Sequence, residues 1–278
     1  MRELAGRTAV VTGAASGIGR ALAVELARHG MALALSDVNE AGLADTRACV
    51  AASGVRVTTE RVDVADRAAV HSHADAVVAT HGQVHLVVNN AGVGLSAMVS
   101  ELTYDDFEWL MGINFWGVVH GTKAFLPHLL RAEEGHVVNV SSVFGLIGVP
   151  GQSAYNAAKF AVRGFTEALR QELDASGARV GATSVHPGGI RTNIARASRF
   201  SPERERWKSR EQTADEFDRL ARTSPEDAAR AIVRGVRRNA RRVLIGADAH
   251  VVDLVQRILP TGYQRLAVAL GRRGGLVP

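Results

Sequence analysis

The stretch TAVVTGAASGIG, residues 8–19, decides the fold. Residues 8–11 form a short apolar run typical of a buried strand, and a helical pattern follows over residues 17–29. In a doubly wound α/β sheet, the turn between the first strand and the first helix holds the pyrophosphate of a dinucleotide. Gly13 permits a tight turn, and Gly17 and Gly19 let the backbone approach the pyrophosphate at the helix N-terminus. The stretch therefore predicts a dinucleotide site.

Strand and helix patterns alternate along the rest of the chain. Runs typical of strands cover residues 8–11, 31–35, 55–62, 84–88, 136–140, 178–185 and 243–245. Helical patterns cover residues 17–29, 40–53, 66–80, 103–131, 153–174 and 224–237, and a weaker one covers 202–220. Such alternation gives right-handed crossovers and a parallel sheet with helices on both faces. We therefore predict an α/β fold, a Rossmann-type doubly wound sheet of about seven strands, as a single domain over residues 1–278.

The composition is that of an ordinary globular protein. Hydrophobic residues make up 46% of the 278 and charged ones 22%, which excludes a disordered, collagen-like or disulfide-scaffold protein. Cys49 is the only cysteine, so no intramolecular disulfide can form. The N-terminus runs straight into a strand pattern, and no apolar run reaches ~18 residues. We therefore expect no signal peptide, no membrane span and a cytoplasmic location.

The net charge of +5 comes almost entirely from arginine, and much of it lies within residues 191–242. A basic face for nucleic acid or a membrane is conceivable from this charge. Acidic residues are interleaved with these arginines, which favours a solvated surface instead. We therefore expect no nucleic-acid partner, and we predict no metal site.

Asp37 follows the second strand pattern, about 20 residues after the glycine-rich turn. A carboxylate at this place accepts hydrogen bonds from the adenosine ribose diol and repels a 2′-phosphate. Neither residue 16 nor residue 38 is basic, so no cation is available there to hold that phosphate. These residues favour NAD over NADP. The alternative is that Asp37 only caps a turn or a helix.

The ends of the third and fourth strand patterns carry further candidate cofactor contacts. Asp63 and Val64 could touch the adenine. The run after Asn89, which is Asn90, Ala91 and Gly92, could wall the adenine pocket. Spacing alone leaves a purely structural turn as an open alternative at both places.

Ser142 follows the fifth strand pattern, and Tyr155 and Lys159 come thirteen and seventeen residues later. Residues four apart on a helix project from the same face, so the phenol and the ammonium should be neighbours. A phenol is a poor acid–base catalyst at neutral pH, and a nearby ammonium lowers its pKa. Because lowering that pKa to near neutrality needs about 4 kcal/mol, a dry site and the positive charge of a nicotinamide must assist. Ser142 can donate a hydrogen bond to a substrate oxygen.

Together, these motifs resemble those of the short-chain dehydrogenases/reductases. The shared set is Thr12-Gly-x-x-x-Gly-x-Gly, Asp37, Asn89-Asn-Ala-Gly, Asn114, Ser142, Tyr155-x-x-x-Lys159 and Pro187-Gly188, within residues 7–192. The resemblance implies that Tyr155 is the general acid/base, that Lys159 holds the nicotinamide ribose and lowers the Tyr155 pKa, and that Ser142 orients the substrate oxygen. It also implies that Asn114 anchors a water that links Lys159 to solvent. The family spacing to the tyrosine favours Ser142 over Ser141.

The same resemblance implies further cofactor contacts and a quaternary structure. The pyrophosphate turn would include Thr12, Ser16 and Ile18. The nicotinamide would be lined by Pro187, Gly188 and Ile190, and Thr192 would bond its carboxamide or the phosphates. The helices that carry Asn114 and Tyr155 would pair with a second subunit, in a homodimer or homotetramer.

Two segments depart from the shared motifs. Residues 193–222 stand where the family keeps its mobile substrate loop, and here that loop is long and charged. Residues 247–278 form a C-terminal helical extension, whereas many small members end in a glycine-rich tail. An apolar stripe in the extension comprises Val251, Val252, Leu254, Val255, Ile258 and Leu259. We expect the stripe to pack on its own domain or on a partner subunit. A lid over the substrate pocket and a membrane-surface contact are the alternatives.

The sequence thus predicts an NAD-dependent oxidoreductase that acts on a secondary alcohol or ketone. The apolar extension favours a lipophilic or steroid-like substrate. An NADPH-dependent 3-oxoacyl-thioester reductase is an alternative enzyme, against which Asp37 argues. A catalytically silent NAD-sensing or nucleic-acid-binding protein is an alternative of another class, although it has no need for Ser142, Tyr155 and Lys159 together.

Overall fold

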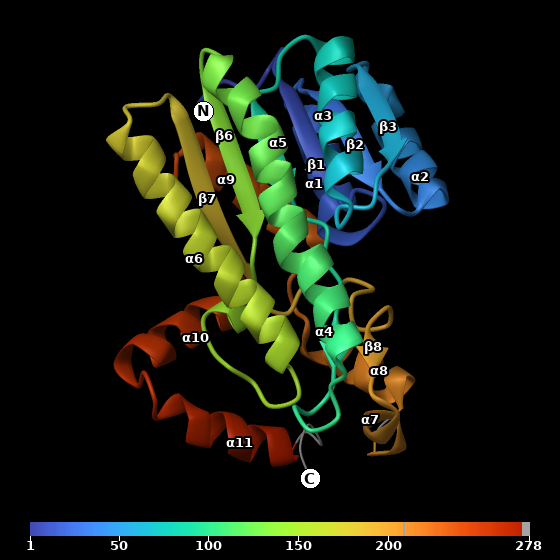
Figure 1. Cartoon of the computed structure of the whole chain (residues 1–278), viewed down its shortest axis with the longest axis vertical. Coiled ribbons are helices and arrows are strands. Elements are labelled where there is room, and N and C mark those ends of the chain that lie inside the picture. Colours follow the sequence, from blue (N-terminus) through green and yellow to red (C-terminus); the bar gives the residue numbers. More distant parts are fainter. Residues whose placement is uncertain (208, 274–278) are drawn as a thin grey trace.

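Seven parallel strands form one continuous sheet in the computed structural model, which describes residues 1–207 and 209–273 (Figure 1). The strands are β1 (Thr8–Thr12), β2 (Ala32–Asp37), β3 (Val57–Arg61), β4 (Leu86–Asn89), β6 (Gly135–Val140), β7 (Val180–Pro187) and β9 (Arg242–Ile245). Their order across the sheet is β3-β2-β1-β4-β6-β7-β9, and every neighbouring pair is parallel. From β1, the following strands β2 and β3 are added on one side, and the strands from β4 to β9 are added on the other. Open α/β sheets bind ligands at the point between β1 and β4 where this order reverses. The predicted doubly wound α/β sheet is confirmed.

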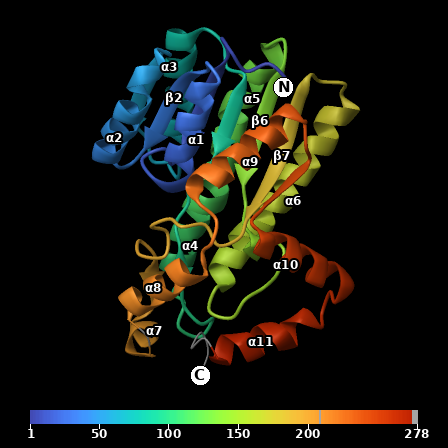
Figure 2. The same ribbon diagram turned by 180° about the vertical axis from the view of Figure 1, so that it is seen from behind.

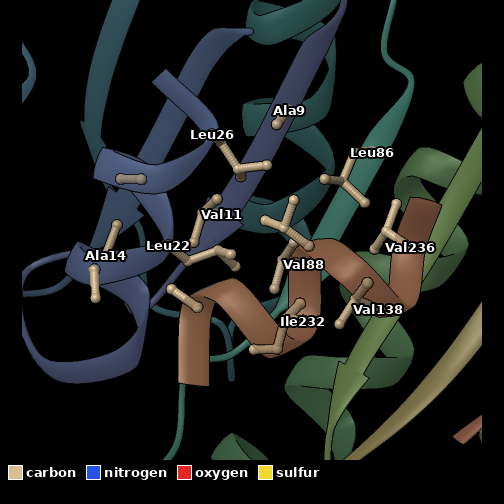
Figure 3. Close-up of a cluster of buried hydrophobic side chains, with 14 of the residues drawn as sticks. Ala9, Val11, Ala14, Leu22, Leu26, Leu86, Val88, Val138, Ile232 and Val236 are labelled. Carbon is tan, nitrogen blue, oxygen red and sulfur yellow. The ribbon is translucent and has the colours of Figure 1, made fainter. Parts of the chain in front are cut away.

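Helices cover both faces of the sheet. One apolar layer joins the sheet to α1 (Gly17–Arg28), α2 (Glu40–Val50) and α9 (Pro225–Arg237). The other joins it to α3 (Arg67–His81), α5 (Gly117–Arg131) and α6 (Ser153–Ala175). Figure 2 shows the first layer from its own side. Figure 3 shows Leu22 and Leu26 of α1 in one apolar cluster with Ile232 and Val236 of α9, over β1, β4 and β6. The core is aliphatic because the chain contains few aromatic residues.

Local sequence signals set several helix starts. Side chains of Asn39, Asp66, Thr103 and Ser224 accept backbone hydrogen bonds at the first turns of α2, α3, α4 (Tyr104–Met111) and α9. Such caps satisfy N–H groups that have no partner within the helix. The helix after β2 ends in a short 3-10 turn, Ala51–Ser53, closed by Gly54 in a left-handed conformation.

The long helical pattern of residues 103–131 forms two α-helices joined by a π-helical segment. α4 ends at Met111, the segment Gly112–Trp116 is π-helical, and α5 begins at Gly117. Asn114 is fully buried within the π-helical segment. Its side-chain amide donates to the carbonyl of Val93 and its carbonyl accepts from the N–H of Val93, each at 2.8 Å. The sequence pattern predicted the helix but not the wider turn, which is often a mark of functional sites.

Polar side chains form a buried chain through the sheet beneath its carboxyl edge. Asn89 and Asn139 are register partners on β4 and β6, and the Asn89 amide donates to the Asn139 carbonyl oxygen at 2.8 Å. The Asn139 amide donates to the hydroxyl of Thr166 on α6 at 2.9 Å, and the Asn89 amide also donates to Thr122 on α5 at 3.1 Å. These contacts tie β4 and β6 to the helices that flank them.

The predicted substrate loop, residues 193–222, contains regular structure. β8 (Arg199–Phe200) pairs in parallel with β5 (Leu95–Ser96), and the helices α7 (Pro202–Trp207) and α8 (Arg210–Leu220) follow. Arg199 bonds the carboxylate of Asp106 at 3.0 Å and lies 3.6 Å from the ring centroid of Trp109. These contacts attach the segment to α4, beyond the carboxyl edge of the sheet.

The C-terminal extension consists of α10 (Ala247–Ile258) and α11 (Tyr263–Arg273), and residues 274–278 of the predicted extension lie outside the described residues. Asp253 on α10 is paired with Arg242 of β9, and Arg242 also reaches Glu167 on α6. The buried side of α10 presents Ala249 and Asp253. Within this chain, Val252 and Val255 of the predicted stripe are half-buried, whereas Val251, Leu254, Ile258 and Leu259 are exposed and do not pack on their own domain. Packing of the stripe on a partner subunit stays a prediction. Among the described residues, no helix has both the length and the apolar character needed to cross a membrane.

Candidate active site

The carboxyl ends of the parallel strands bring the predicted residues to one edge of the sheet. Thr12 ends β1, Asp37 ends β2, Asn90 follows β4, and Ser142 follows β6. In Figures 1 and 2, the segment with α7 and α8 and the extension with α10 and α11 both lie beyond this edge. The edge is where α/β sheets of this topology hold ligands.

The glycine-rich turn is tied to the end of β4. The hydroxyl of Thr12 accepts hydrogen bonds from the N–H groups of Asn90 and Ala91, both at 3.1 Å. The amide of Asn90 donates to the carbonyls of Thr12 and Gly13 at 3.0 and 3.1 Å. Gly13 has φ +67°, and a Cβ there would lie 2.7 Å from Ala91 Cα. Thr12, Asn90 and Ala91 therefore shape the turn itself, whichever ligand it holds.

Gly19 serves the turn in a way that the sequence analysis did not foresee. A Cβ at Gly19 would collide with the carbonyl oxygen of Gly13 and would lie 2.7 Å from the Asn90 amide nitrogen. The glycine is thus required by close packing of α1 on its own turn, in addition to any approach of a pyrophosphate. Gly17 begins α1, and a Cβ on it would lie 3.1 Å from the methyl of Thr192. The structure therefore places predicted Thr192 beside the turn.

The N-terminus of α1 fits an anionic group. Its N-cap, Ser16, makes no side-chain cap, as is also the case at the starts of α6 and α10. The first turn of α1, with Gly17 and Ile18, also contains no acidic residue. Uncapped N–H groups and the helix dipole favour a phosphate at this place.

Asp37 lies at the rim of the turn. One carboxylate oxygen accepts from the N–H of Ala15 and the other from the N–H of Asn39, both at 3.0 Å. Asp37 therefore bonds its local backbone, as the capping alternative expects, and also lies next to the glycine-rich turn. Each carboxylate oxygen has a further lone pair available to a ribose hydroxyl.

Asp63 and Val64 have local structural roles. The Asp63 carboxylate accepts from the N–H of Ala65 at 2.9 Å, as in a turn. Val64 is buried, and a Cβ on Gly117 would lie 2.7 Å from its side chain. Contact of either residue with an adenine stays a prediction.

The structure brings Ser142, Tyr155 and Lys159 together. Lys159 Nζ lies 5.6 Å from the ring centroid of Tyr155, and it donates to the carbonyl of Val140 at 3.0 Å. The Ser142 side chain forms a hydrogen bond with the Tyr155 hydroxyl. Ser142 also accepts from the N–H of Phe144 at 3.1 Å, in the 3-10 turn Val143–Gly145. A serine hydroxyl, a phenol and an ammonium therefore share one small volume.

Burial moves the pKa values of Tyr155 and Lys159 in opposite directions. It raises the pKa of the Tyr155 phenol to about 12, and the hydrogen bond with Ser142 opposes only part of this rise. It lowers the pKa of the Lys159 ammonium to about 8. The chain alone therefore keeps the phenol neutral, because water is lost around the phenolate. That Lys159 lowers the Tyr155 pKa together with a bound nicotinamide stays a prediction. At pH 7 the pair consists of a neutral phenol and a charged ammonium.

Ser141 and His186 support this group without facing it. The Ser141 hydroxyl donates to the backbone carbonyl of Lys159 at 2.8 Å, which separates its role from that of Ser142. His186 is fully buried, and burial lowers its pKa to about 4. The neutral ring donates from Nδ1 to the carbonyl of Ser142 at 3.0 Å, and Nε2 contacts the Ser184 hydroxyl at 2.9 Å. Both residues fix backbone next to the candidate catalytic side chains.

Gly92 lies between Asn114 and Lys159. A Cβ on Gly92 would be 3.2 Å from Asn114 Oδ1 and 3.5 Å from Lys159 Nζ. The Asn114 side chain is committed to Val93, so its direct effect is to hold the backbone that follows Gly92. The predicted water link between Asn114 and Lys159 stays a prediction.

The turn after β7 is anchored by a residue that the sequence analysis missed. Pro187 ends β7, and the N–H of Gly188 donates to the carbonyl of Ile245 at 2.9 Å. The N–H of Gly189 donates to the carboxylate of Asp248 at 2.6 Å, from the first turn of α10. Asp248 could have been noticed as an acidic residue just after the last strand pattern, but its target is distant in sequence. Ile190 is buried beside this turn.

Comparisons with known proteins agree with this geometry. The family model for short chain dehydrogenase matches residues 7–202. SadH of Mycobacterium tuberculosis, which carries the name of an oxidoreductase, is 52% identical over 270 residues, covering 97% of this chain and 96% of the relative. A short chain dehydrogenase/reductase from Burkholderia phymatum, solved in complex with NAD, has a TM-score of 0.84 and 34% identity over 94% of this chain and 96% of that one. An alcohol dehydrogenase from Thermococcus sibiricus, solved with 5-hydroxy-NADP, has a TM-score of 0.72 and 26% identity over 86% of this chain and 95% of that one.

The chain belongs to the short-chain dehydrogenase/reductase family. It is an oxidoreductase that acts with NAD(P) on CH–OH donors. The catalytically silent alternative is therefore wrong. Both NAD and an NADP derivative occur among the similar structures, so the family leaves the choice of cofactor open.

Proposed function

We propose that this enzyme transfers a hydride between NAD and a lipophilic, steroid-like secondary alcohol or ketone, with Tyr155 as the acid/base. The observation that carries the proposal is the convergence of Ser142, Tyr155 and Lys159, with Lys159 Nζ 5.6 Å from the Tyr155 ring centroid. The uncapped start of α1, the turn around Gly13 and the carboxylate of Asp37 fit the cofactor. When bound, the nicotinamide would supply the hydride donor or acceptor.

The three side chains divide the proton chemistry between them. The neutral Tyr155 phenol donates its proton to a carbonyl oxygen in the direction of reduction. Ser142 donates a hydrogen bond to the same oxygen and stabilises the charge that develops on it. In the direction of oxidation Tyr155 must first lose its proton, so that the phenolate can accept the proton of the alcohol. The Lys159 ammonium, fixed by Val140, stabilises that phenolate before the transfer.

Tyr155→Phe tests this assignment. We expect the rate to fall by at least about 100-fold, because general acid–base catalysis contributes about 10²–10⁴-fold. NAD affinity, measured by titration, should change by less than about threefold. Tyr104→Phe is the matched control, because Tyr104 is 88% exposed at the start of α4 and should behave as wild type. A screen of secondary alcohols and ketones, followed by nicotinamide absorbance with both cofactors, provides the substrate. Unchanged turnover in Tyr155→Phe would show that another group moves the proton.

The preference for NAD rests on Asp37. A 2′-phosphate near this carboxylate would meet like charge, and one such repulsion near a protein surface amounts to about 1–3 kcal/mol. Asp37→Ala should therefore lower the ratio of kcat/KM with NAD to kcat/KM with NADP by about tenfold. Asp45→Ala, on the exposed side of α2, is the matched control. An unchanged ratio in Asp37→Ala would contradict the ribose role.

Oligomerisation through α4, α5 and α6 is the structural part of the proposal. Trp116 is 50% exposed and Phe160 40% exposed, on the helical elements that carry Asn114 and Tyr155. Large exposed apolar side chains on neighbouring helices favour a subunit interface. Light scattering after chromatography should give a dimer or tetramer for wild type and a smaller species for Trp116→Arg/Phe160→Arg. A monomeric wild type would refute this part. A cytoplasmic location stays a prediction.

A further inference from the structure

The extension presents an unusually apolar surface that its own domain does not cover. We call this surface the tail face, and it consists of Val251, Leu254, Ile258, Leu259, Leu266 and Leu270, each half or more exposed. Three of these lie at i, i+3 and i+7 on α10, and two lie at i and i+4 on α11, so each helix has one apolar side turned to solvent. Several large apolar side chains exposed on neighbouring helices mark an interaction site.

The charge of the tail face is positive from residue 254 onward, and the acidic residues of α10, Asp248 and Asp253, lie before that point. From residue 254 to the end, the sequence contains four arginines and no acidic residue or lysine. Arg257 pairs with Asp253, which is itself held by Arg242. For Arg265 and Arg272, the described residues offer no ion pair. The two helices thus combine exposed Leu, Ile and Val with cationic side chains that remain available to an anionic partner.

This charge pattern argues against a second copy of the chain as the partner. A symmetric contact between two tail faces would bring arginines of both copies together without any carboxylate from residues 254–273 between them. Like charges opposed across an interface are unfavourable. An anionic bilayer instead offers both an apolar layer for the aliphatic side chains and headgroup phosphates for the arginines.

The extension that carries the tail face contacts the loop next to the candidate catalytic residues. The hydroxyl of Tyr263, the first residue of α11, accepts a hydrogen bond from the N–H of Gly148 at 3.0 Å. Gly148 lies in the loop that joins Ser142 to Tyr155. Figures 1 and 2 show α10 and α11 along the end of the molecule beyond the carboxyl edge of the sheet.

We propose that the tail face rests on the surface of an anionic phospholipid bilayer. The helices, of 12 and 11 residues, lie along the interface with their apolar sides in the headgroup region. If the proposed function holds, a lipophilic substrate reaches the loop around Gly148 directly from the bilayer.

Vesicle flotation of the full chain, without cofactor or substrate, tests the proposal independently of catalysis. We expect binding to vesicles of phosphatidylcholine with about 30% phosphatidylglycerol to be at least about tenfold tighter than binding to pure phosphatidylcholine, and to weaken when NaCl rises. Ile258→Ser/Leu270→Ser should bind at least about tenfold more weakly, and Arg265→Gln/Arg272→Gln should lose most of the preference for the anionic vesicles. Leu130→Ser is the matched control, because Leu130 is also 50% exposed but lies on the last turn of α5, at the opposite end of the sheet. Circular dichroism and NAD titration establish that each variant is folded.

Three results would overturn the proposal. The first is no binding of wild type to anionic vesicles at low salt. The second is equal binding by wild type and Ile258→Ser/Leu270→Ser. The third is that wild type does not bind vesicles while Ile258→Ser/Leu270→Ser has a different oligomeric mass from wild type. That result would assign the tail face to a second copy of the chain.

Discussion

The buried ammonium of Lys159 should make the free enzyme less stable than a variant without that charge. Lys159 is 4% exposed, and burial lowers its pKa from 10.5 to about 8. A pKa that is lower in the folded than in the unfolded chain means that, below pH 8, the folded chain holds a charge that its surroundings disfavour. At about 1.4 kcal/mol for each pKa unit, this penalty is about 3 kcal/mol at pH 7. It decreases to about 2 kcal/mol at pH 9 and disappears above the unfolded pKa, where both states are neutral.

Lys159→Met removes the charge and keeps an unbranched apolar stem. We expect the free energy of unfolding at pH 7 to rise by about 2–3 kcal/mol, since one hydrogen bond to Val140 is lost together with the charge. This gain corresponds to a rise in Tm of about 4–10 °C for a chain of this size. The assay is urea unfolding and thermal unfolding without cofactor, at pH 7 and at pH 9. The gain should be smaller at pH 9.

Lys123→Met provides the control for this experiment, because Lys123 is exposed on α5. Its effect should stay within about 0.5 kcal/mol at both pH values. A Lys159→Met variant that is less stable than wild type at pH 7 would refute the reasoning, and so would a gain that is equal at both pH values. A confirmed gain would mean that stability is lost at this position in exchange for catalysis.

Three further outcomes follow from contacts described above. Ser142→Ala should lower kcat by about 10²–10³-fold with NAD affinity unchanged. Ser141→Ala should instead lower the free energy of unfolding by about 1 kcal/mol and change kcat by less than about tenfold. Steady-state kinetics and urea unfolding separate the two variants, and equal kcat values would contradict the distinction. Asp248→Ala should weaken NAD binding by about fivefold, because the N–H of Gly189 loses its acceptor, and Asp248→Asn should restore most of it; a titration in which both variants bind like wild type would show that the anchor is unimportant. Phe125→Ala, in the core beneath α5, should lower the free energy of unfolding by about 3–5 kcal/mol, and a urea midpoint equal to that of wild type would mean that the site is not packed as the structure shows.

The sequence predicted what depends on residues close together along the chain. The glycine-rich turn, the alternation of apolar runs and the cap of α9 at Ser224 each follow from local rules, and the structure contains all three. The spacing between Tyr155 and Lys159 likewise fixes their common helix face. These features required no knowledge of which strands become neighbours.

What escaped prediction depends on contacts between distant segments. Asp248 meets Gly189 across 59 positions, and β8 meets β5 across about a hundred, so no local pattern signals either pairing. The exposure of Ile258 and Leu254 was also unpredictable, because an apolar stripe has the same sequence pattern whether it packs inward or faces solvent. The rise in the Tyr155 pKa reflects burial by several elements at once, which spacing along one helix cannot reveal.

The asparagine chain within the sheet has a consequence for how this enzyme could be altered. Side chains alternate between the two faces of a strand, so a one-residue slip of β4 against β6 would turn Asn89 away from Asn139 and into an apolar layer. Each buried amide left without a partner would cost about 1–3 kcal/mol, and the native alignment is selected by that difference. The register of β4 against β6 is thus favoured from inside the sheet. A change in the connections beyond the carboxyl edge, such as residues 193–222, should therefore leave the alignment of these two strands as it is.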